Sequence, residues 1–391
     1  MKAERAPTVK VFYVIGSMEL GGAEQHLLRV SSALRAQGYA PEVFALTIGG
    51  PLTQAFADNC IPVHGVRLPQ WLTRFLRHER AVAWAGLIFS SGALWWLYWR
   101  RRPQVVHFFL PAAYIVGGVV ALFGPRMRRV MSRRSLNLYQ DKHKLFRRIE
   151  HWLHPRMDLV CGNSKAVVSD LQAEGIEPTR LRLIYNGMPL ERFEACLPRA
   201  QVRASLGLSD DCLVFAIVAN LIPYKGHDDL IDALGLIRDR LPADWACLCI
   251  GRDDGIGPAL RARAESLNIG DHMRFLGSRK DVPDLLCSAD IGVLCSHEEG
   301  FSNAVLEGMA AGLPMVVTDV GGNAEAVVQG DTGLVVPPKS PETLSAALLN
   351  MAEHPHRSEF GARGLDRVTR VFSMEACVQG YRQIYEEPLP M

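Results

Sequence analysis

The sequence lacks a C-x-x-C pair, and none of its cysteine and histidine spacings suits a zinc site, although nine cysteines are present. Several cysteines lie in apolar runs, such as Cys247 and Cys249 within residues 245–250. We therefore expect buried free thiols in a reducing compartment and no disulfide framework. The first residues also lack an apolar stretch with a small-residue cleavage site, so we do not expect secretion.

Internal repeats, low-complexity tracts and recognisable nucleic-acid-binding modules are absent as well. The composition is that of a folded protein, with 48% hydrophobic and 21% charged residues, which excludes general disorder. A chain of 391 residues is too long for one typical core, and its length therefore predicts two domains.

Short apolar runs alternate with amphipathic helical patterns along the chain. The predicted strands are residues 9–15, 41–48, 104–109, 158–162, 213–219, 245–251, 273–276, 291–295, 315–318 and 334–336. This alternation predicts parallel sheets with helices on both faces. We therefore predict an α/β protein with two Rossmann-like domains, residues 1–190 and 200–370. A cleft between them is the expected active site, because ligands bind beyond the carboxyl ends of parallel strands.

Positive charge is concentrated in the first half. Residues 1–200 contain 27 Lys and Arg against 14 Asp and Glu, a net +13, whereas residues 201–391 contain 16 against 27, a net −11. Residues 126–156 alone hold ten cations and two acids, with aromatic Tyr139 and Phe146 between them. This pattern suits an anionic lipid surface or a lipid-linked phosphate. Nucleic acid and a merely solvated surface are the alternatives.

One uncharged segment interrupts the soluble pattern. The segment 81–99 is a run of 19 uncharged residues that includes four tryptophans, and three arginines follow at 100–102. The length approaches that of a transmembrane helix. A span here would divide the first sheet, so we favour a helix that lies in the membrane interface through residues 81–102. A core helix and a true span are the alternatives.

The sharpest local motif ends at Glu307 and contains a second carboxylate, Glu299, with seven residues between the two. Glu299 follows a predicted strand, and Ser302 is a suitable helix N-cap, which places Glu307 in the second helical turn. The free N–H groups of such a helix start bind phosphate, and carboxylates on either side accept hydrogen bonds from sugar and ribose hydroxyls. The alternative is a surface helix with acidic residues.

This motif resembles the E-x7-E element of the family-4 retaining glycosyltransferases of the GT-B type. Gly-Met-Ala-Ala-Gly-Leu-Pro at 308–314 and Asp-Val-Gly-Gly-Asn-Ala-Glu at 319–325 are similar to the elements that follow it in that family. The resemblance covers nearly the whole chain, and the three elements occur in order and at family spacing. It implies a GT-B fold in which the first domain binds an acceptor and the second binds a nucleotide-sugar donor.

The resemblance also implies roles for individual residues. Glu299 would contact the donor sugar near its anomeric carbon, and Glu307 would bind the ribose. Backbone groups between Gly277 and Val282 would hold the nucleobase. The residues that would meet the diphosphate or the sugar are Gly300, Phe301, Ser302 and Asn303.

Lys225 follows the first strand of the second domain, where a lysine can neutralise a leaving diphosphate. A solvated lysine at a helix start is the alternative. The resembling family commonly carries an arginine five residues before this lysine, where this chain has Asn220, so one expected cation is missing. Arg252, which follows the next strand, is the predicted substitute.

The first domain offers further candidates at strand ends. Gly21 and Gly22 join the first strand to a helix, where glycine lets a phosphate approach the backbone, although a plain turn is the alternative. His107 lies in an apolar strand, where a lone histidine is usually a hydrogen-bonded core residue. By the resemblance, His107 instead faces the donor sugar and positions it. Arg133 or Arg134 would hold an acceptor phosphate.

We expect no cofactor and no metal. The Asp pairs at 210–211, 228–229 and 253–254 are interpreted as helix caps or loop residues, and the resembling fold neutralises diphosphate with Lys, Arg and helix N-termini. The resemblance further implies that residues 371–391 form a helix that crosses back to the first domain.

Together, the motifs and the resemblance predict a metal-independent, retaining glycosyltransferase. The expected donor carries a hexose or N-acetylhexosamine, with UDP favoured over GDP-mannose. The expected acceptor is a lipid-linked glycan of polysaccharide or lipopolysaccharide synthesis, at the cytoplasmic face of the cell membrane and without nucleic acid. A UDP-sugar epimerase, a non-catalytic nucleotide-sugar-binding protein and a soluble transferase of metabolites are the alternatives.

Overall fold

The protein is described by a computed structural model, and the described residues are 9–19, 21–76, 78–136, 140 and 143–387. The chain forms two compact units. Unit 1 comprises Met1–Tyr185 with Cys377–Met391, and unit 2 comprises Asn186–Ala376. The divisions predicted at residues 190–200 and 370 lie close to these limits. The start of the chain, on which the secretion argument rests, and Tyr139 lie outside the described residues.

The sheet of unit 1 has seven parallel strands in the order β3-β2-β1-β4-β5-β6-β7. They are β1 (Lys10–Ile15), β2 (Ala40–Ala45), β3 (Val63–His64), β4 (Val105–Phe109), β5 (Arg128–Arg133), β6 (Leu159–Gly162) and β7 (Leu181–Leu183). The chain extends the sheet from β1 toward β3 and then returns to add β4 on the other side of β1. The carboxyl ends of β1 and β4 therefore form a switch point, where such sheets bind ligands.

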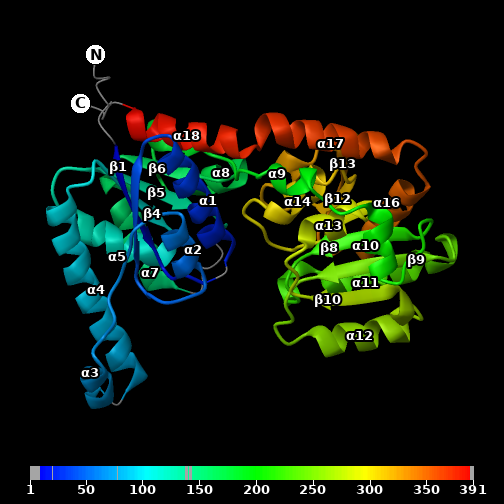
Figure 1. The fold of residues 1–391 in the computed structure, drawn as a ribbon, viewed down its shortest axis with the longest axis horizontal. Helices are drawn as coiled ribbons and strands as arrows, with labels where there is room; N and C mark the ends of the chain where they lie inside the picture. Colours follow the sequence, from blue (N-terminus) through cyan, green and yellow to red (C-terminus); the bar gives the residue numbers. More distant parts are fainter. Residues whose placement is uncertain (1–8, 20, 77, 137–139, 141–142, 388–391) are drawn as a thin grey trace. The chain divides into compact units, whose positions relative to one another are not determined.

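The helices of unit 1 cover this sheet and bury its apolar side chains, which include Phe12, Phe44 and Phe108. They are α1 (Gly22–Ala36), α2 (Leu52–Asp58), α3 (Gln70–Phe75), α4 (Glu79–Arg101), α5 (Pro111–Ala121), α7 (Lys144–Leu153), α8 (Lys165–Ala173) and α18 (Met374–Glu386), with 3₁₀ turns at His154–Arg156 and Pro178–Arg180. Figure 1 shows α4 extending away from the sheet, with α3 at its far end.

Unit 2 is built on a six-stranded parallel sheet in the order β10-β9-β8-β11-β12-β13. Its strands are β8 (Leu213–Val218), β9 (Trp245–Ile250), β10 (Met273–Gly277), β11 (Ile291–Leu294), β12 (Met315–Thr318) and β13 (Gly333–Val336). The chain again grows in one direction, from β8 to β10, and then returns to place β11 beside β8. The second switch point therefore lies between the loops that follow β8 and β11.

The helices of unit 2 precede its first strand, lie between consecutive strands or follow its last strand in sequence. They are α9 (Glu191–Glu194), α10 (Arg199–Ser205), α11 (His227–Ile237), α12 (Gly257–Ser266), α13 (Val282–Cys287), α14 (Asn303–Ala310), α15 (Asn323–Ala326), α16 (Pro341–Glu353) and α17 (Arg357–Val371), with 3₁₀ turns at Pro223–Lys225, Arg238–Arg240 and Gly270–His272.

All ten predicted strands are confirmed, with ends that differ by at most three residues. The sequence did not predict β3, β5 or β7. Two of these are only two and three residues long. Strand β5 begins and ends with arginines, Arg128 and Arg133, which are nevertheless buried. A strand with arginine at both ends is not recognised as an apolar run, because arginine is usually exposed.

Helix α18 belongs to unit 1 from Cys377 onward and is attached there by buried hydroxyl groups. Tyr385 Oη lies 2.7 Å from His107 Nδ1 and donates to Tyr13 Oη at 3.2 Å. One turn earlier, Tyr381 Oη lies 3.2 Å from His26 Nε2. These tyrosines are therefore both apolar core residues and polar anchors of the helix.

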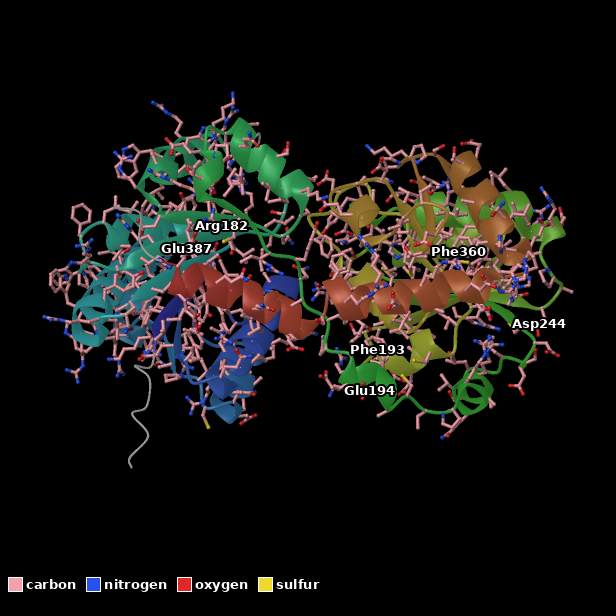
Figure 2. The ribbon with its side chains drawn as sticks, turned by 90° about the horizontal axis from the view of Figure 1, so that it is seen from above. Arg182, Phe193, Glu194, Asp244, Phe360 and Glu387 are labelled. Atoms are coloured by element: carbon pink, nitrogen blue, oxygen red, sulfur yellow. The ribbon has the colours of Figure 1, made fainter. Side chains whose placement is uncertain are left out.

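Two arginines of the sheet attach the end of the same helix. Arg128 of β5 donates to the carbonyl oxygen of Ile384, and Arg182 of β7 lies with its Nη2 2.6 Å from Glu387 Oε1. Figure 2 labels Arg182 and Glu387 at this end of α18. Arg128 belongs to the basic segment 126–156, so part of that charge serves the interior of unit 1 and does not lie on its surface.

Tyr385→Phe should lower the free energy of unfolding by about 1–3 kcal/mol, because it leaves His107 Nδ1 buried without a hydrogen bond. The matched control is Tyr98→Phe. Among the described residues, the buried Tyr98 hydroxyl has no hydrogen-bond partner, so its removal should be neutral or stabilising. Urea unfolding of the two variants measures the difference, and equal effects would contradict this account of α18.

Candidate active site

The switch point of unit 2 brings two predicted residues into direct contact. Lys225 lies in the loop after β8 and Glu299 in the loop after β11, 74 positions later. Lys225 Nζ lies 2.6 Å from Glu299 Oε1, and the side chains are 18% and 11% exposed. The pairing follows from the strand order, because β8 and β11 are neighbours in the sheet. A lysine and a carboxylate at this place can bind a phosphate and a sugar hydroxyl, respectively.

The Glu299 carboxylate is held by a chain of hydrogen bonds. Ser296 Oγ donates to Glu299 Oε1 at 2.8 Å, and the Ser296 carbonyl accepts from Thr318 Oγ1 at 2.6 Å. Thr318 is the last residue of β12, the next strand of the sheet. The carboxylate is therefore held in place by groups of the protein itself, as a preorganised binding site requires.

Two glycines permit the close packing of the loops around this pair. A Cβ on Gly226 (φ +69°) would lie 2.1 Å from the carbonyl oxygen of Cys295. A Cβ on Gly321 (φ +53°), in the turn after β12, would lie 2.0 Å from the carbonyl oxygen of Glu299. Both positions need glycine, because the backbone is left-handed and no space exists for a side chain.

The loop from Glu299 to α14 contains the predicted donor-binding residues. Ser302 occupies the N-cap position of α14 as predicted, although its side chain makes no capping hydrogen bond. Asn186 Nδ2 donates to the Phe301 carbonyl at 3.0 Å and to Asn303 Oδ1 at 2.8 Å. Glu307 lies half-buried in the second turn. The first N–H groups of α14 lack partners within the helix and suit an anion.

The residues that hold this loop were not predicted from the sequence. Asn186, Ser296 and Thr318 are polar residues that follow or end a strand, and no spacing distinguishes them from ordinary turn residues. His297 was also missed, and its Nε2 lies 2.8 Å from Asp229 Oδ2 of α11. The strand order brings together the loops of Ser296, His297 and Thr318, whereas Asn186 follows β7, a strand of the other sheet.

Arg252, the predicted substitute for the missing arginine, is paired with another residue. Its Nε donates to Asp254 Oδ1 at 2.7 Å and its Nη2 to Asp254 Oδ2 at 3.2 Å. The Arg252 backbone N–H donates to Asn220 Oδ1 at 3.0 Å, so Asn220 has a role in fixing this loop. A diphosphate would have to displace Asp254 before Arg252 could neutralise it.

The predicted nucleobase loop begins at Gly277, which ends β10 beside an irregularity in the strand pairing. The Gly277 carbonyl accepts from the Gly251 backbone N–H at 3.0 Å. Arg279 and Asp281 form an ion pair at 2.5 Å within the loop, and Val282 begins α13. These contacts fix the loop at the carboxyl edge of the sheet, where Lys225 and Glu299 also lie.

In unit 1, the Gly21–Gly22 turn is partly occupied by a carboxylate. A Cβ on Gly21 would lie 2.1 Å from Glu24 Oε2, so the Glu24 side chain covers this backbone. Burial raises the pKa of Glu24 above its usual value. A phosphate that approaches Gly21 would have to displace this side chain or meet it in its protonated form.

His107 is completely buried in the same region of unit 1. Its Nδ1 lies 2.7 Å from Tyr385 Oη and its Nε2 2.8 Å from Ser132 Oγ. Burial lowers the pKa of His107 well below its usual value, and the charge of Arg134 lowers it further. These contacts favour the hydrogen-bonded core residue that the sequence left as the alternative. A contact with a donor sugar would require the ring to exchange one of these partners.

Arg133 and Arg134 differ although they are adjacent. The Arg133 side chain is 3% exposed and forms ion pairs with Glu150, at 3.0 Å, and with Glu174. Arg134 is half-buried. Its charge lowers the pKa values of both His26 and His107, so it lies at the carboxyl edge of the sheet with the other candidates. Arg133 would first have to leave two buried carboxylates before it could meet an acceptor phosphate.

Among the described residues, one group could hold a metal ion, namely His151, His154 and Glu174. Burial raises the pKa of Glu174, but hydrogen bonds from His154 and Arg133 outweigh it and hold that pKa well below its usual range. The carboxylate is thus already balanced by the Arg133 cation. The group includes none of the predicted donor-binding residues, and metal-independent transfer stays a prediction.

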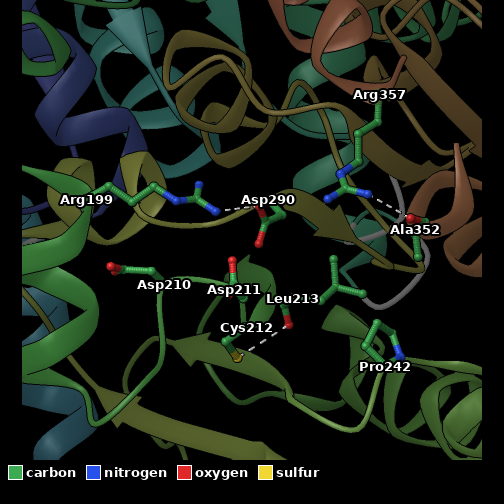
Figure 3. A pocket seen from close by; sticks show the side chains of 9 residues that line it. All are labelled: Arg199, Asp210, Asp211, Cys212, Leu213, Pro242, Asp290, Ala352 and Arg357. Atoms are coloured by element: carbon green, nitrogen blue, oxygen red, sulfur yellow. Dashed lines mark hydrogen bonds and ion pairs between the residues drawn. The ribbon is translucent and has the colours of Figure 1, made fainter. Parts of the chain in front are cut away.

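A hollow of about 260 Å³ in unit 2 lies at the edge of the sheet opposite to Lys225 and Glu299 (Figure 3). It is lined by Arg199, Asp210, Asp211, Cys212, Leu213, Pro242, Asp290, Ala352 and Arg357. Leu213 begins β8 and Asp290 precedes β11, so the hollow lies at the amino ends of these strands. Donor binding at this fold's switch point requires the carboxyl ends, where Lys225 and Glu299 lie.

Comparisons with known proteins agree with this architecture. The model of Glycosyltransferase Family 4 matches residues 20–192, and the model of Glycosyl transferases group 1 matches residues 212–354. The structure of Alr3699/HepE from Anabaena in complex with UDP-glucose superimposes with a TM-score of 0.80 at 21% identity, over 97% of this chain and 100% of that one. Together with the two sheets, these matches define a glycosyltransferase of GT-B fold. The chain belongs to family 4 of the glycosyltransferases.

Two curated relatives represent the sequence matches. The lipopolysaccharide core biosynthesis mannosyltransferase LpsB of Rhizobium meliloti (strain 1021) is 27% identical over 238 residues, which cover 59% of this chain and 66% of LpsB. The D-inositol 3-phosphate glycosyltransferase of Salinispora tropica is 32% identical over 245 residues, 59% of this chain and 51% of that enzyme. The matched regions thus span between half and two thirds of the relatives' length.

Arg133→Met should lower the free energy of unfolding by about 3–5 kcal/mol, because it leaves Glu150 and Glu174 buried without their cation. The control is Arg148→Met, which removes an exposed arginine and should change stability by less than about 0.5 kcal/mol. Urea unfolding measures both variants. Wild-type stability of Arg133→Met with a raised KM for the acceptor would instead support the predicted phosphate contact.

Proposed function

We propose that the protein transfers a hexose or N-acetylhexosamine from a nucleotide-sugar to a lipid-linked glycan, with retention of the anomeric configuration and without a metal. The observation that carries this proposal is the contact between Lys225 and Glu299 at the switch point of unit 2. Near the start of α14, this contact brings together Lys225, which would bind the diphosphate, and Glu299, which would bind the sugar. The arrangement favours transfer over simple nucleotide binding, because it stabilises a leaving group.

The proposed donor is a UDP-sugar. The HepE structure holds UDP-glucose, which supports this choice, whereas the name of LpsB describes a mannosyltransferase and keeps GDP-mannose as the second candidate. Recognition of the base would use backbone groups between Gly277 and Val282. Backbone N–H and C=O groups are the same in every residue, so both bases stay candidates.

In the proposed reaction, the diphosphate takes the place of Glu299 beside Lys225. The Glu299 carboxylate is then available to accept hydrogen bonds from the donor sugar, while Glu307 accepts from the ribose. The acceptor hydroxyl attacks the anomeric carbon from the side that the diphosphate leaves, and the leaving phosphate takes the proton. Lys225 and the N–H groups of α14 stabilise the charge that develops on that phosphate.

Lys225→Met should weaken the binding of UDP by about 10- to 100-fold, because it removes one charge-assisted hydrogen bond to the diphosphate. Binding of uridine, which lacks the diphosphate, should stay unchanged. Isothermal titration calorimetry measures both, with GDP and guanosine replacing this pair if the protein binds GDP instead.

The control for this variant is Lys339→Met, which removes an exposed lysine outside the site. It should leave both affinities at the wild-type value. If wild type and Lys225→Met bind UDP with equal affinity, Lys225 does not bind the diphosphate. An equal loss for UDP and uridine would indicate a disturbed loop and would also contradict the assigned role.

We further propose that unit 1 associates with the inner face of the cell membrane. Helix α4 is long and apolar enough to cross a membrane, and 22% of its apolar window is buried. Its later turns carry Leu94, Leu97 and Tyr98, which are buried in the core of unit 1. A helix whose second half belongs to a soluble core is better suited to the membrane interface than to a span.

The exposed side chains of α4 support this placement. Trp84 is 66% exposed and Ile88 67%, and Trp95 and Trp99 recur on the same face at helical spacing. The indole N–H groups of Trp95 and Trp99 both donate to the Phe123 carbonyl, at 2.9 and 3.3 Å. Aromatic rings with one polar group each are typical of the headgroup region of a bilayer.

Helix α7 carries further exposed side chains, cations among them. Its exposed apolar residues include Leu145, Phe146 and Trp152, and Arg156 stacks on the Trp152 ring with 4.0 Å from Cζ to the ring centroid. This is the part of segment 126–156 that suits an anionic lipid. Arg128 and Arg133 of the same segment are excluded from the surface by their burial.

Trp84→Ser combined with Trp96→Ser should reduce binding to vesicles of phosphatidylcholine and phosphatidylglycerol by at least about tenfold, because two exposed rings lose their apolar environment. Leu236→Ser is the control, since Leu236 is a similarly exposed apolar residue of unit 2. Cosedimentation measures binding. Unchanged binding of the double variant would exclude α4 as the membrane contact.

A further inference from the structure

Two cysteines that are far apart in sequence meet in unit 2. Cys196 lies between α9 and α10, and Cys287 is the last residue of α13, 91 positions later. The Cys287 thiol donates to Cys196 Sγ, and the two sulfur atoms are 2.7 Å apart. Both residues are half-buried free cysteines, so a small reagent can reach them. Sulfur atoms this close can bond with little movement of the backbone.

Contacts that do not involve sulfur keep the two cysteines together. The backbone N–H of Leu197, next to Cys196, donates to Asp284 Oδ1 at 2.9 Å, one helical turn before Cys287. Farther along the same segment, Arg199 Nη2 lies 2.5 Å from Asp290 Oδ1, as Figure 3 shows. Phe193 and Glu194, labelled in Figure 2, belong to α9 directly before Cys196. The segment after Cys196 is thus anchored to Asp284 of α13 and to Asp290, which lie on either side of Cys287 in the sequence.

We propose that Cys196 and Cys287 form a reversible disulfide when the protein meets a small-molecule disulfide such as glutathione disulfide. This goes beyond the transferase activity and does not depend on it. The bond would join the segment after Asn186 to α13, whose first residue, Val282, borders the predicted nucleobase loop. In the oxidised protein, a covalent bond would therefore close the loop of unit 2 between Cys196 and Cys287, which hydrogen bonds alone close in the reduced protein.

The reaction balances with glutathione disulfide as the only oxidant. The Cys196 thiolate attacks one glutathione sulfur, which breaks the glutathione disulfide, forms a mixed disulfide and releases one glutathione thiolate. The Cys287 thiolate then attacks Cys196 Sγ and releases the second glutathione. The two protons of the cysteines go to the two glutathione thiolates. Cys196 attacks first because Cys287 is the hydrogen-bond donor of the pair.

Oxidation should become faster as the pH rises. Burial, with the hydrogen bond to Cys196, raises the pKa of the Cys287 thiol to about 12. The second step needs the thiolate of Cys287, so its rate increases with pH throughout the range in which the protein is folded.

The test uses the full chain, first reduced and then incubated with glutathione disulfide, followed by alkylation of the remaining thiols. Trypsin with a protease that cleaves before aspartate releases residues 193–199 and 284–289, each with one cysteine. Mass spectrometry under non-reducing conditions should find these two peptides joined, with the mass of two hydrogen atoms lost. The joined peptide should disappear after dithiothreitol and should be absent from Cys196→Ser.

Thermal unfolding gives a second measurement. The oxidised protein should unfold at least about 5 °C higher than the reduced one, because the bond closes a long loop of the unfolded chain. Cys60, which is exposed, serves as the internal control and should carry a single glutathione at most. The proposal is overturned if Cys60 reacts while Cys196 and Cys287 are recovered alkylated, or modified separately and not joined. Cys60→Ser should leave the joined peptide unchanged.

Discussion

The proposed donor site depends on the ion pair between Lys225 and Glu299, and that pair depends on the strand order of unit 2. Because β11 returns to lie beside β8, two loops 74 positions apart share one edge of the sheet. In the absence of donor, each charge of the half-buried pair compensates the other, which avoids the cost of an unpaired charge. A nucleotide diphosphate can replace Glu299 beside the lysine, so in the proposed reaction donor binding and release of the carboxylate are one event.

Two arginines of the basic segment 126–156 serve the interior of unit 1. Arg128 attaches α18, and Arg133 balances two buried carboxylates, so neither contributes to a basic surface. Exposed cations of this segment lie on α7 beside exposed aromatic residues, and further exposed apolar side chains lie on α4. The proposed membrane contact therefore rests on amphipathic helices and not on net charge, which predicts a contact that is only partly sensitive to salt.

Much of the fold could be predicted from the sequence, because ten strands are apolar runs bounded by turn residues and the alternation with helices implies parallel sheets. The positions of Glu299, Ser302 and Glu307 followed from one local motif. Partners could not be predicted in the same way. Asn186 and Thr318 are polar residues at strand ends without a distinctive spacing, and the pairing of Arg252 with Asp254 depends on side-chain geometry. Burial of Arg133 was missed because its carboxylate partners lie 17 and 41 positions away.

The most direct test of the central claim is a screen of nucleotide-sugars for release of nucleotide diphosphate, with and without a membrane lipid extract. The account predicts release from one donor, with UDP-sugars favoured, and only when the extract supplies an acceptor. Conversion of a donor without acceptor and without release of nucleotide would instead identify an epimerase. Binding of a donor without any turnover in the presence of the extract would contradict the proposed transfer and identify a nucleotide-sugar-binding protein.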